Sequence, residues 1–147
     1  MNMASLVLPT LWAGLLIGVS FIATPAKFEA RSLALPVALD VGRTTFAIWN
    51  NVEWLLLAIT GPTMIFSSHD VFSIAAIGAV DILLLVQSMS LLPALNTRTS
   101  TIIAGRRLPP SSDHFLYVAF DALKLGILTA IIWKQGEYFI SLATQSH

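Results

Sequence analysis

The sequence contains no cysteine. Disulfides, thiolate metal sites, cysteine nucleophiles and covalently attached c-type haem are therefore excluded. Charged residues are also scarce, at 11% of 147 residues, whereas soluble domains average about 25%. So few charges cannot cover a globular surface, and 56% of the residues are hydrophobic. We therefore expect lipid to be the solvent of much of the protein.

Neither sign of charge dominates the sequence. Eight basic and eight acidic residues give a formal net charge of zero, which gives no indication of a nucleic-acid partner. The length predicts a single domain, residues 1–147. The apolar run 3–25 lacks a preceding basic residue and is longer than the about 7–15 residues of a signal-peptide core, so we expect a retained helix.

Four long apolar segments predict an all-α, polytopic membrane protein. A bilayer core of about 30 Å requires about 20 apolar residues in a helix. The expected spans are residues 3–24, 43–66, 71–95 and 113–134. A short polar turn joins the second and third spans, and 96–112 is expected to be a loop. We expect Pro36 to start a helix leading into the second span, and the first connection to lie along the inner membrane surface.

The distribution of basic residues predicts the orientation of these spans. The two long connections, 25–42 and 96–112, and their borders hold six basic residues, whereas the opposite face holds Lys134 and the amino terminus. The six are Lys27, Arg31, Arg43, Arg98, Arg106 and Arg107. Because cytoplasmic loops are enriched in Lys and Arg, we expect both connections in the cytoplasm and both termini outside, in a bacterial inner membrane.

A short pattern occurs in both halves of the chain. Pro25-Ala26 is followed by Arg31-Ser32, and Pro93-Ala94 is followed by Arg98-Thr99-Ser100. Two helical hairpins related by an axis along the membrane normal would produce this pattern. Chance resemblance between two apolar hairpins is the alternative.

Polar residues follow one face of the second and fourth predicted helices. The second span places Arg43, Phe46, Asn50 and Glu53 at the spacing at which the fourth places His114, Tyr117, Asp121 and Lys124. Glu53 and Lys124 each lie ten residues into their spans, about 15 Å deep. Asp81 reaches a similar depth from the other side.

This register predicts a buried polar cluster near the membrane centre. Its expected members are Asn50, Glu53, Asp81, Asp121 and Lys124, and Arg43 with His114 is expected to form a polar pair at the inner end. One cation cannot neutralise three carboxylates, so a shared proton, a bound cation or a water-filled cavity would restore the balance. The alternative is a structural role, either between these helices or towards another subunit.

Other motifs point to packing rather than to chemistry. Gly14 and Gly18 form a GxxxG pattern, which we interpret as helix packing. No GxSxG, HExxH or P-loop sequence occurs, and we predict neither a catalytic residue nor a metal site. His69 and His114 lie at opposite membrane faces and cannot bind one haem together. We predict no cofactor, and the alternatives are haem bound through His114 alone or a haem shared across an oligomer interface.

The first half of the chain resembles a known group of proteins. The residues concerned are Trp12-x-Gly14, Gly18, Phe21, Pro25 and Phe28, followed by Gly42-Arg43-x-x-Phe46. They resemble a group of small four-helix membrane proteins that includes transmembrane-protein-205-like chains. The resemblance implies a four-helix fold and no established reaction, and it assigns no role to Asn51, Glu53 or Lys124.

These observations lead to three functional hypotheses. We expect a small, non-enzymatic integral membrane protein that is an accessory or assembly subunit of a larger membrane complex, or a homo-oligomer. The alternative is a binding or transport protein for a proton, a cation or a small amphipathic solute at the buried polar cluster. A b-type haem membrane protein is the third.

Overall fold

Helices account for nearly all of the described chain. The structure is a computed structural model that describes residues 3–67, 70–106, 108–109 and 112–145. Within these ranges it contains no strand, which confirms the all-α prediction. The elements are α1 (Ala4–Leu16), η1 (Ile17–Ala23), α2 (Thr24–Glu29), α3 (Leu35–Ser67), α4 (Val71–Val86), η2 (Gln87–Leu91), α5 (Leu92–Ile103) and α6 (Asp113–Gln145), where η denotes a π-helix.

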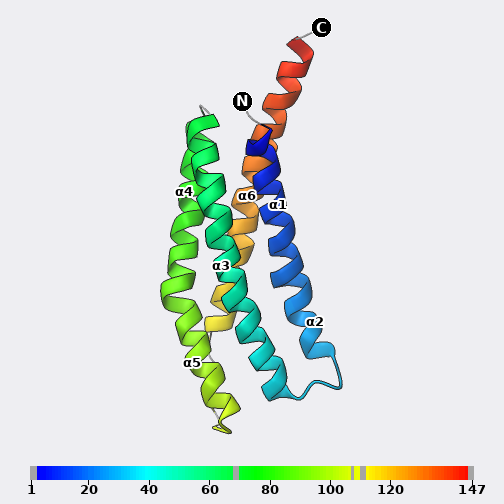
Figure 1. Cartoon of the computed structure of the whole chain (residues 1–147), viewed down its shortest axis with the longest axis vertical. Coiled ribbons are helices and arrows are strands. Elements are labelled where there is room, and N and C mark those ends of the chain that lie inside the picture. The colour runs from blue at the N-terminus through cyan, green and yellow to red at the C-terminus, as the bar shows by residue number, and fades with distance from the viewer. Residues whose placement is uncertain (1–2, 68–69, 107, 110–111, 146–147) are drawn as a thin grey trace.

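These elements form four helical rods that lie side by side (Figure 1). The first rod is α1–η1–α2, the second is α3, the third is α4–η2–α5 and the fourth is α6. The first and third rods each pack against both α3 and α6. The α2–α3 connection and the end of α5 lie at one end of the molecule, and both chain termini lie at the other (Figure 1).

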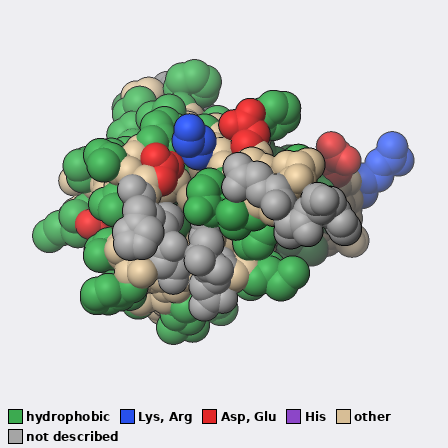
Figure 2. All heavy atoms as spheres, turned by 90° about the horizontal axis from the view of Figure 1, so that it is seen from above, with side chains coloured by type: hydrophobic (Ala, Val, Ile, Leu, Met, Phe, Trp, Pro, Cys, Tyr) green, Lys and Arg blue, Asp and Glu red, His purple; other side chains and the backbone are tan. Residues whose placement is uncertain are grey.

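Three of the rods are long and apolar enough to cross a membrane. They are Ala4–Glu29, Val71–Ile103 and Asp113–Leu142. Hydrophobic side chains cover most of the periphery when the molecule is viewed from above (Figure 2). The second rod is not among the three, because Asn50, Asn51 and Glu53 interrupt its apolar sequence. Its identity as a fourth span remains a prediction.

Two predicted connections are shorter than expected. Helix α3 begins at Leu35 with Pro36 in its first turn, as expected, but residues 35–42 continue directly into the helix. They are therefore not a separate segment along the membrane surface. The predicted loop 96–112 is also partly wrong, since α5 extends to Ile103. Residues 96–104 contain neither glycine nor proline, so nothing in this stretch interrupts the helix. Gly105 follows with a positive φ of 82°, a conformation that glycine adopts most readily, and it ends the helix.

A π-helical turn precedes a proline in both the first and the third rod. The Thr24 N–H donates to the Val19 carbonyl, and the Leu92 N–H donates to the Gln87 carbonyl, each five residues back. Pro25 and Pro93 follow directly. A proline ring clashes with the carbonyl four residues earlier and has no N–H to donate, so a widened turn accommodates it. The repeated Pro-Ala sequence therefore coincides with the same backbone feature in both halves.

The interior between the rods is filled by large apolar side chains. The largest core cluster includes Trp12, Leu16, Trp49, Val80 and Leu128, all buried. The GxxxG glycines do not belong to this interior. A Cβ atom added at Gly14 or Gly18 would have no neighbour within 4 Å, so these glycines permit no close helix contact within the described chain. The expectation that they serve packing inside the molecule is wrong, because the apolar face of α1 that turns inward carries Trp12 and Leu16 instead.

Asp70 caps the amino terminus of α4. Its carboxylate accepts hydrogen bonds from the backbone N–H groups of Phe72 and Ser73, at 3.3 and 3.2 Å, and from the Ser73 hydroxyl at 2.8 Å. Desolvation acts to raise the pKa of Asp70, but these hydrogen bonds outweigh it and hold that pKa below its usual value. The cap satisfies backbone donors that the first turn of a helix leaves free.

Replacing Asp70 by alanine is expected to lower the free energy of unfolding by about 1 kcal/mol, because two backbone donors lose their acceptor. Asp70→Asn, which retains a capping oxygen, is the matched control and should lie within a few tenths of a kcal/mol of the native chain. The contribution of the ionised carboxylate is complete above the unfolded pKa of about 3.9 and is lost as the pH falls through the lower folded pKa. Unfolding by sodium dodecyl sulfate in mixed micelles measures both effects, and equal losses for the two variants would contradict the cap.

Candidate functional site

Three ionisable side chains meet in the interior between α3 and α6. Glu53, Asp121 and Lys124, here called the charge cluster, each have 0% exposed surface. Lys124 Nζ lies 2.5 Å from Glu53 Oε1 and 3.0 Å from Asp121 Oδ1. Asp121 and Lys124 reach the same place because residues three apart share one face of a helix. The lysine thus bridges two carboxylates in a site without solvent contact.

Uncharged donors from the other two rods complete the charge cluster. Trp12 Nε1 donates to Glu53 Oε1 at 3.3 Å. Ser20 Oγ donates to Asp121 Oδ2 at 2.6 Å, and Gln87 Nε2 donates to Asp121 Oδ1 at 2.8 Å. Ser20 lies in η1 and Gln87 in η2, so both π-helical turns position a donor for Asp121. All four rods therefore contribute to one polar site.

The charge cluster is not internally balanced. Two carboxylates face one ammonium group, which leaves one excess negative charge if all three are ionised. Three buried polar atoms around it, Glu53 Oε2, Gln87 Oε1 and Tyr117 Oη, have no hydrogen-bond partner among the described residues. Buried polar atoms in native proteins nearly always have a partner, and a buried unpaired charge is costly. The excess negative charge and the unpartnered oxygen atoms would allow the charge cluster to bind one additional proton.

The structure brings together three of the five predicted cluster residues. Asn50 lies one turn from Glu53 on α3, where its Oδ1 accepts a hydrogen bond from Ser88 at 2.5 Å, so it belongs to a separate contact. Asp81 is half-buried and makes no hydrogen bond or ion pair with another described residue. Its predicted membership is wrong because Val80, the preceding residue, occupies the inward face of α4 at 0% exposure. Residue counting along the span placed Asp81 in the cluster, whereas Gln87, six residues further along this rod, is the residue that contacts Asp121.

The predicted inner-end pair does not form a contact either. Arg43 Nη2 lies 2.5 Å from Asp40 Oδ1, and Arg43 Nη1 donates to Ser100 Oγ at 3.1 Å. His114 lies on α6 and lines the same cavity as Arg43 without bonding to it. Two groups that both carry positive charge when protonated have no electrostatic reason to pair, and Asp40 is the nearer partner for Arg43.

An aromatic layer separates the charge cluster from the end of the molecule where His114 lies. The rings of Phe46 and Tyr117 pack at a centroid distance of 4.8 Å and an angle of 57°. Phe46 comes from α3, about two turns before Glu53, and Tyr117 comes from α6, about one turn before Asp121. The layer closes the interior on that side with two buried aromatic side chains.

Sequence reasoning missed the uncharged members of the site. Neither the polar register nor the resemblance gave Trp12, Ser20 or Gln87 a role at this site. Ser20 and Gln87 are polar residues in apolar runs, each five or six residues before a proline, and that placement was a usable signal. A second buried network was also missed: Gln135 accepts from Ser5 at 3.3 Å and donates to Ser73 Oγ at 2.9 Å.

The histidines offer little support for a metal or haem site. Within the described residues, no group of three or more His, Asp or Glu side chains is placed to hold a metal ion. His69 and His147 lie outside the described residues, and His114 lies at the start of α6. Haem bound through His114 remains an untested alternative.

Comparison with known proteins adds no relative. No protein-family model matches the chain, and no curated protein or solved structure is significantly similar to it. The functional argument therefore depends on the geometry of this molecule.

Proposed function

We propose that this chain is a polytopic integral membrane protein that binds a proton at the charge cluster and belongs to the binding or transport class rather than to the enzymes. One observation carries the proposal: two carboxylates and a single ammonium group are in direct contact at 0% exposure. A site of low dielectric strongly disfavours an excess charge, and one proton shared by Glu53 and Asp121 would remove it.

A proton suits the charge cluster better than a metal ion does. The Lys124 ammonium already occupies the position between the two carboxylates that a cation would take. The unpartnered Glu53 Oε2 offers an acceptor for a proton without displacing the lysine. Buried ionisable groups within membrane-spanning helices commonly serve proton relays.

Membrane insertion of all four rods is the second part of the proposal. Helix α3 has 33 residues, which at 1.5 Å per residue is about 50 Å, longer than a bilayer core. Its charged midpoint, Glu53, is turned inward, whereas Ile48, Leu55 and Ile59 are exposed on its outer surface. An apolar exterior with a paired interior charge is what a lipid-facing helix requires. The basic end would face the cytoplasm, and both termini would lie outside.

The interior also supports a four-helix bundle of two repeated hairpins. Ser5, Trp12 and Leu16 are buried in α1, and Ser73, Val80 and Leu84, each 68 positions later, are buried in α4. Two pairs of contacting residues, Phe46 with Tyr117 and Glu53 with Lys124, are each separated by 71 positions. Parallel repeats about an axis along the membrane normal would give both regularities.

The accessory-subunit and homo-oligomer hypotheses remain predictions. The charge cluster gives these hypotheses no support, because its three side chains are fully buried and contact one another within a single chain. The resemblance to transmembrane-protein-205-like chains is compatible with the proposed fold and contributes no reaction.

Infrared spectroscopy of the purified full chain tests the proton directly. At pH 7 we expect one protonated carboxyl group per chain, seen as a carbonyl band that shifts in deuterium oxide. Exposed carboxyl groups are ionised at this pH and contribute no such band. Glu53→Gln and Asp121→Asn should each abolish the band, because the single remaining carboxylate would then be balanced by Lys124.

Asp81→Asn is the matched control, since Asp81 is a half-buried carboxyl group of the third rod that lies outside the charge cluster; this variant should retain the band. Absence of the band from the native chain, or its persistence in both cluster variants, would overturn the proposal.

A further inference from the structure

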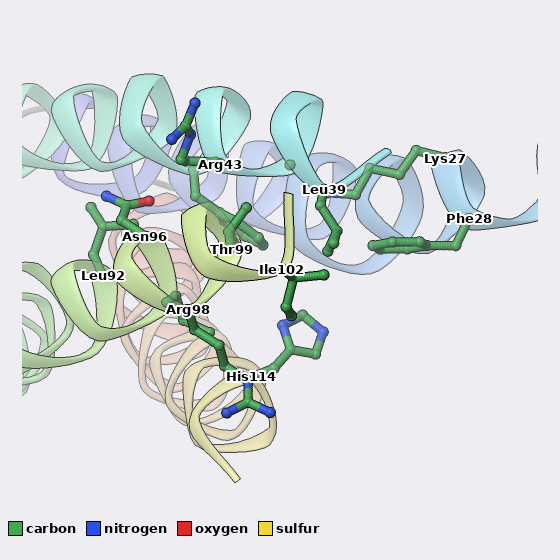
Figure 3. A pocket seen from close by; sticks show the side chains of 13 residues that line it. Lys27, Phe28, Leu39, Arg43, Leu92, Asn96, Arg98, Thr99, Ile102 and His114 are labelled. Atoms are coloured by element: carbon green, nitrogen blue, oxygen red, sulfur yellow. The ribbon is translucent and has the colours of Figure 1, made fainter. Parts of the chain in front are cut away.

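A cavity opens at the end of the rods that carries most of the basic residues. It has a volume of about 290 Å³ and lies between α2, α3, α5 and the start of α6. Figure 3 shows the side chains that line it, with Lys27 and Phe28 coming from α2, Arg98 from α5 and His114 from α6. The Phe46–Tyr117 layer separates this basic cavity from the charge cluster.

The charges around the basic cavity have one sign. Lys27, Arg43, Arg98 and His114 line it, and none of the described lining residues is acidic. Asp40 already pairs with Arg43, and Arg98 donates to the Pro109 carbonyl while retaining further N–H groups. Among the described residues, neither the Lys27 ammonium group nor the Arg98 guanidinium group has a carboxylate partner.

Lys27 is the most distinctive of these groups. It is half-buried and forms no ion pair or hydrogen bond with a described residue. Its Nζ lies 5.1 Å from the centre of the Phe28 ring and 5.2 Å from that of Phe46, within the range of cation–π attraction. Two aromatic rings thus hold an ammonium group at the cavity wall, where its charge has no anionic partner.

Gly42 allows this placement of the lysine. A Cβ atom at residue 42 would lie 2.5 Å from Lys27 Nζ and 3.2 Å from its Cε. Any larger residue would therefore displace the ammonium group, whose flexible side chain can move away. A substitution at Gly42 would therefore move the Lys27 ammonium group without removing its charge.

Most of the rest of the cavity wall is apolar, with Asn96 and Thr99 as two uncharged polar residues. Phe28, Leu39, Leu92, Leu95 and Ile102 contribute most of it. A site with cationic groups on one side and aliphatic and aromatic side chains on the other matches a ligand that is itself part anion and part hydrocarbon.

We propose that the basic cavity binds the anionic group of an amphiphile, with its carboxylate or phosphate at Lys27 and Arg98 and its hydrocarbon chain along the apolar wall. Free fatty acids and anionic phospholipids share this chemistry. The site does not depend on the proton proposed for the charge cluster, since the two sets of charged residues are different.

Native mass spectrometry of the full chain in a neutral detergent tests this proposal. The probes are palmitoyl-oleoyl phosphatidylglycerol and oleate, with zwitterionic palmitoyl-oleoyl phosphatidylcholine, whose net charge is zero, as the comparison. We expect at least one anionic probe to bind about tenfold more tightly than phosphatidylcholine, the size of effect expected for one charge-assisted hydrogen bond. Preference for phosphatidylglycerol identifies a phospholipid headgroup, and preference for oleate identifies a free fatty acid; either supports the site.

Substitutions locate the binding. Lys27→Gln and Arg98→Gln should each weaken the preferred probe about tenfold, whereas Arg31→Gln, a basic residue at the same end that does not line the cavity, should leave it unchanged. Gly42→Ala should also weaken binding while keeping every charge, and alanine in a helix favours folding. Equal binding of phosphatidylcholine, or equal effects of Lys27→Gln and Arg31→Gln, would overturn the proposal.

Discussion

Replacing Lys124 by methionine is expected to lower the free energy of unfolding by about 3–5 kcal/mol. The substitution leaves Glu53 and Asp121 facing each other at 0% exposure without the cation that bridges them. Removing one partner of a buried ion pair costs far more than the net value of the pair, because the remaining charge has lost both water and counterion. Methionine keeps the length and most of the volume, so a packing defect contributes little.

Lys134→Met is the matched control on the same helix. Lys134 is exposed, and its substitution should change stability by less than about 0.5 kcal/mol. Unfolding by sodium dodecyl sulfate in mixed micelles measures both variants. The double substitution Glu53→Gln with Lys124→Met should recover at least half of the loss, because only one carboxylate then remains. A loss for Lys124→Met no larger than that for Lys134→Met would show that the charge cluster contributes little to stability.

The second large effect is expected for Trp12→Ala, at about 3 kcal/mol. Trp12 is fully buried in the core cluster and donates the hydrogen bond to Glu53. Alanine would leave a large void and remove a donor from a carboxylate already short of partners. The value lies at the lower end of the range for soluble proteins because lipid, in the proposed membrane setting, is itself apolar and only packing is lost.

Trp133 provides a control of the same residue type. It is 71% exposed, and its ring nitrogen donates to Glu137 on the same helix face. Trp133→Ala should change the free energy of unfolding by no more than about 0.5 kcal/mol. Equal losses for Trp12→Ala and Trp133→Ala would mean that the interior packing described above does not hold the rods together.

Sequence periodicity predicted the charge cluster well where two helices are straight. Glu53 on α3 and Lys124 on α6 occupy corresponding places in the two sequences, and both helices are uninterrupted around them. Residue spacing could therefore predict both the position of these side chains along the helix axis and the helix face on which they lie. The same reasoning identified Asp121, three residues before Lys124, as a neighbour.

It was less successful on the first and third rods, for a physical reason. Asp81 was placed by counting residues from the expected outer end of its span, and that count determines neither the level of the cluster nor the direction of the side chain. Gln87, six residues later, is the residue of this rod that reaches Asp121. Six residues of helix correspond to about 9 Å along the axis, so the level counted from the end of the span missed the site. Gln87 continues the three- and four-residue spacing of the buried residues from Ser73 to Leu84, so the inward face of this helix, rather than depth, was the usable signal.

The widened turns also bear on how this protein tolerates change in chain length. A π-turn is the arrangement that an α-helix adopts when it carries one residue more than its regular period allows while both flanking segments stay packed. Ser20 in η1 and Gln87 in η2 both donate to Asp121, and Pro25 and Pro93 follow these turns. Removing one residue from either turn would therefore disturb the accommodation of a proline and the donors of a buried carboxylate together.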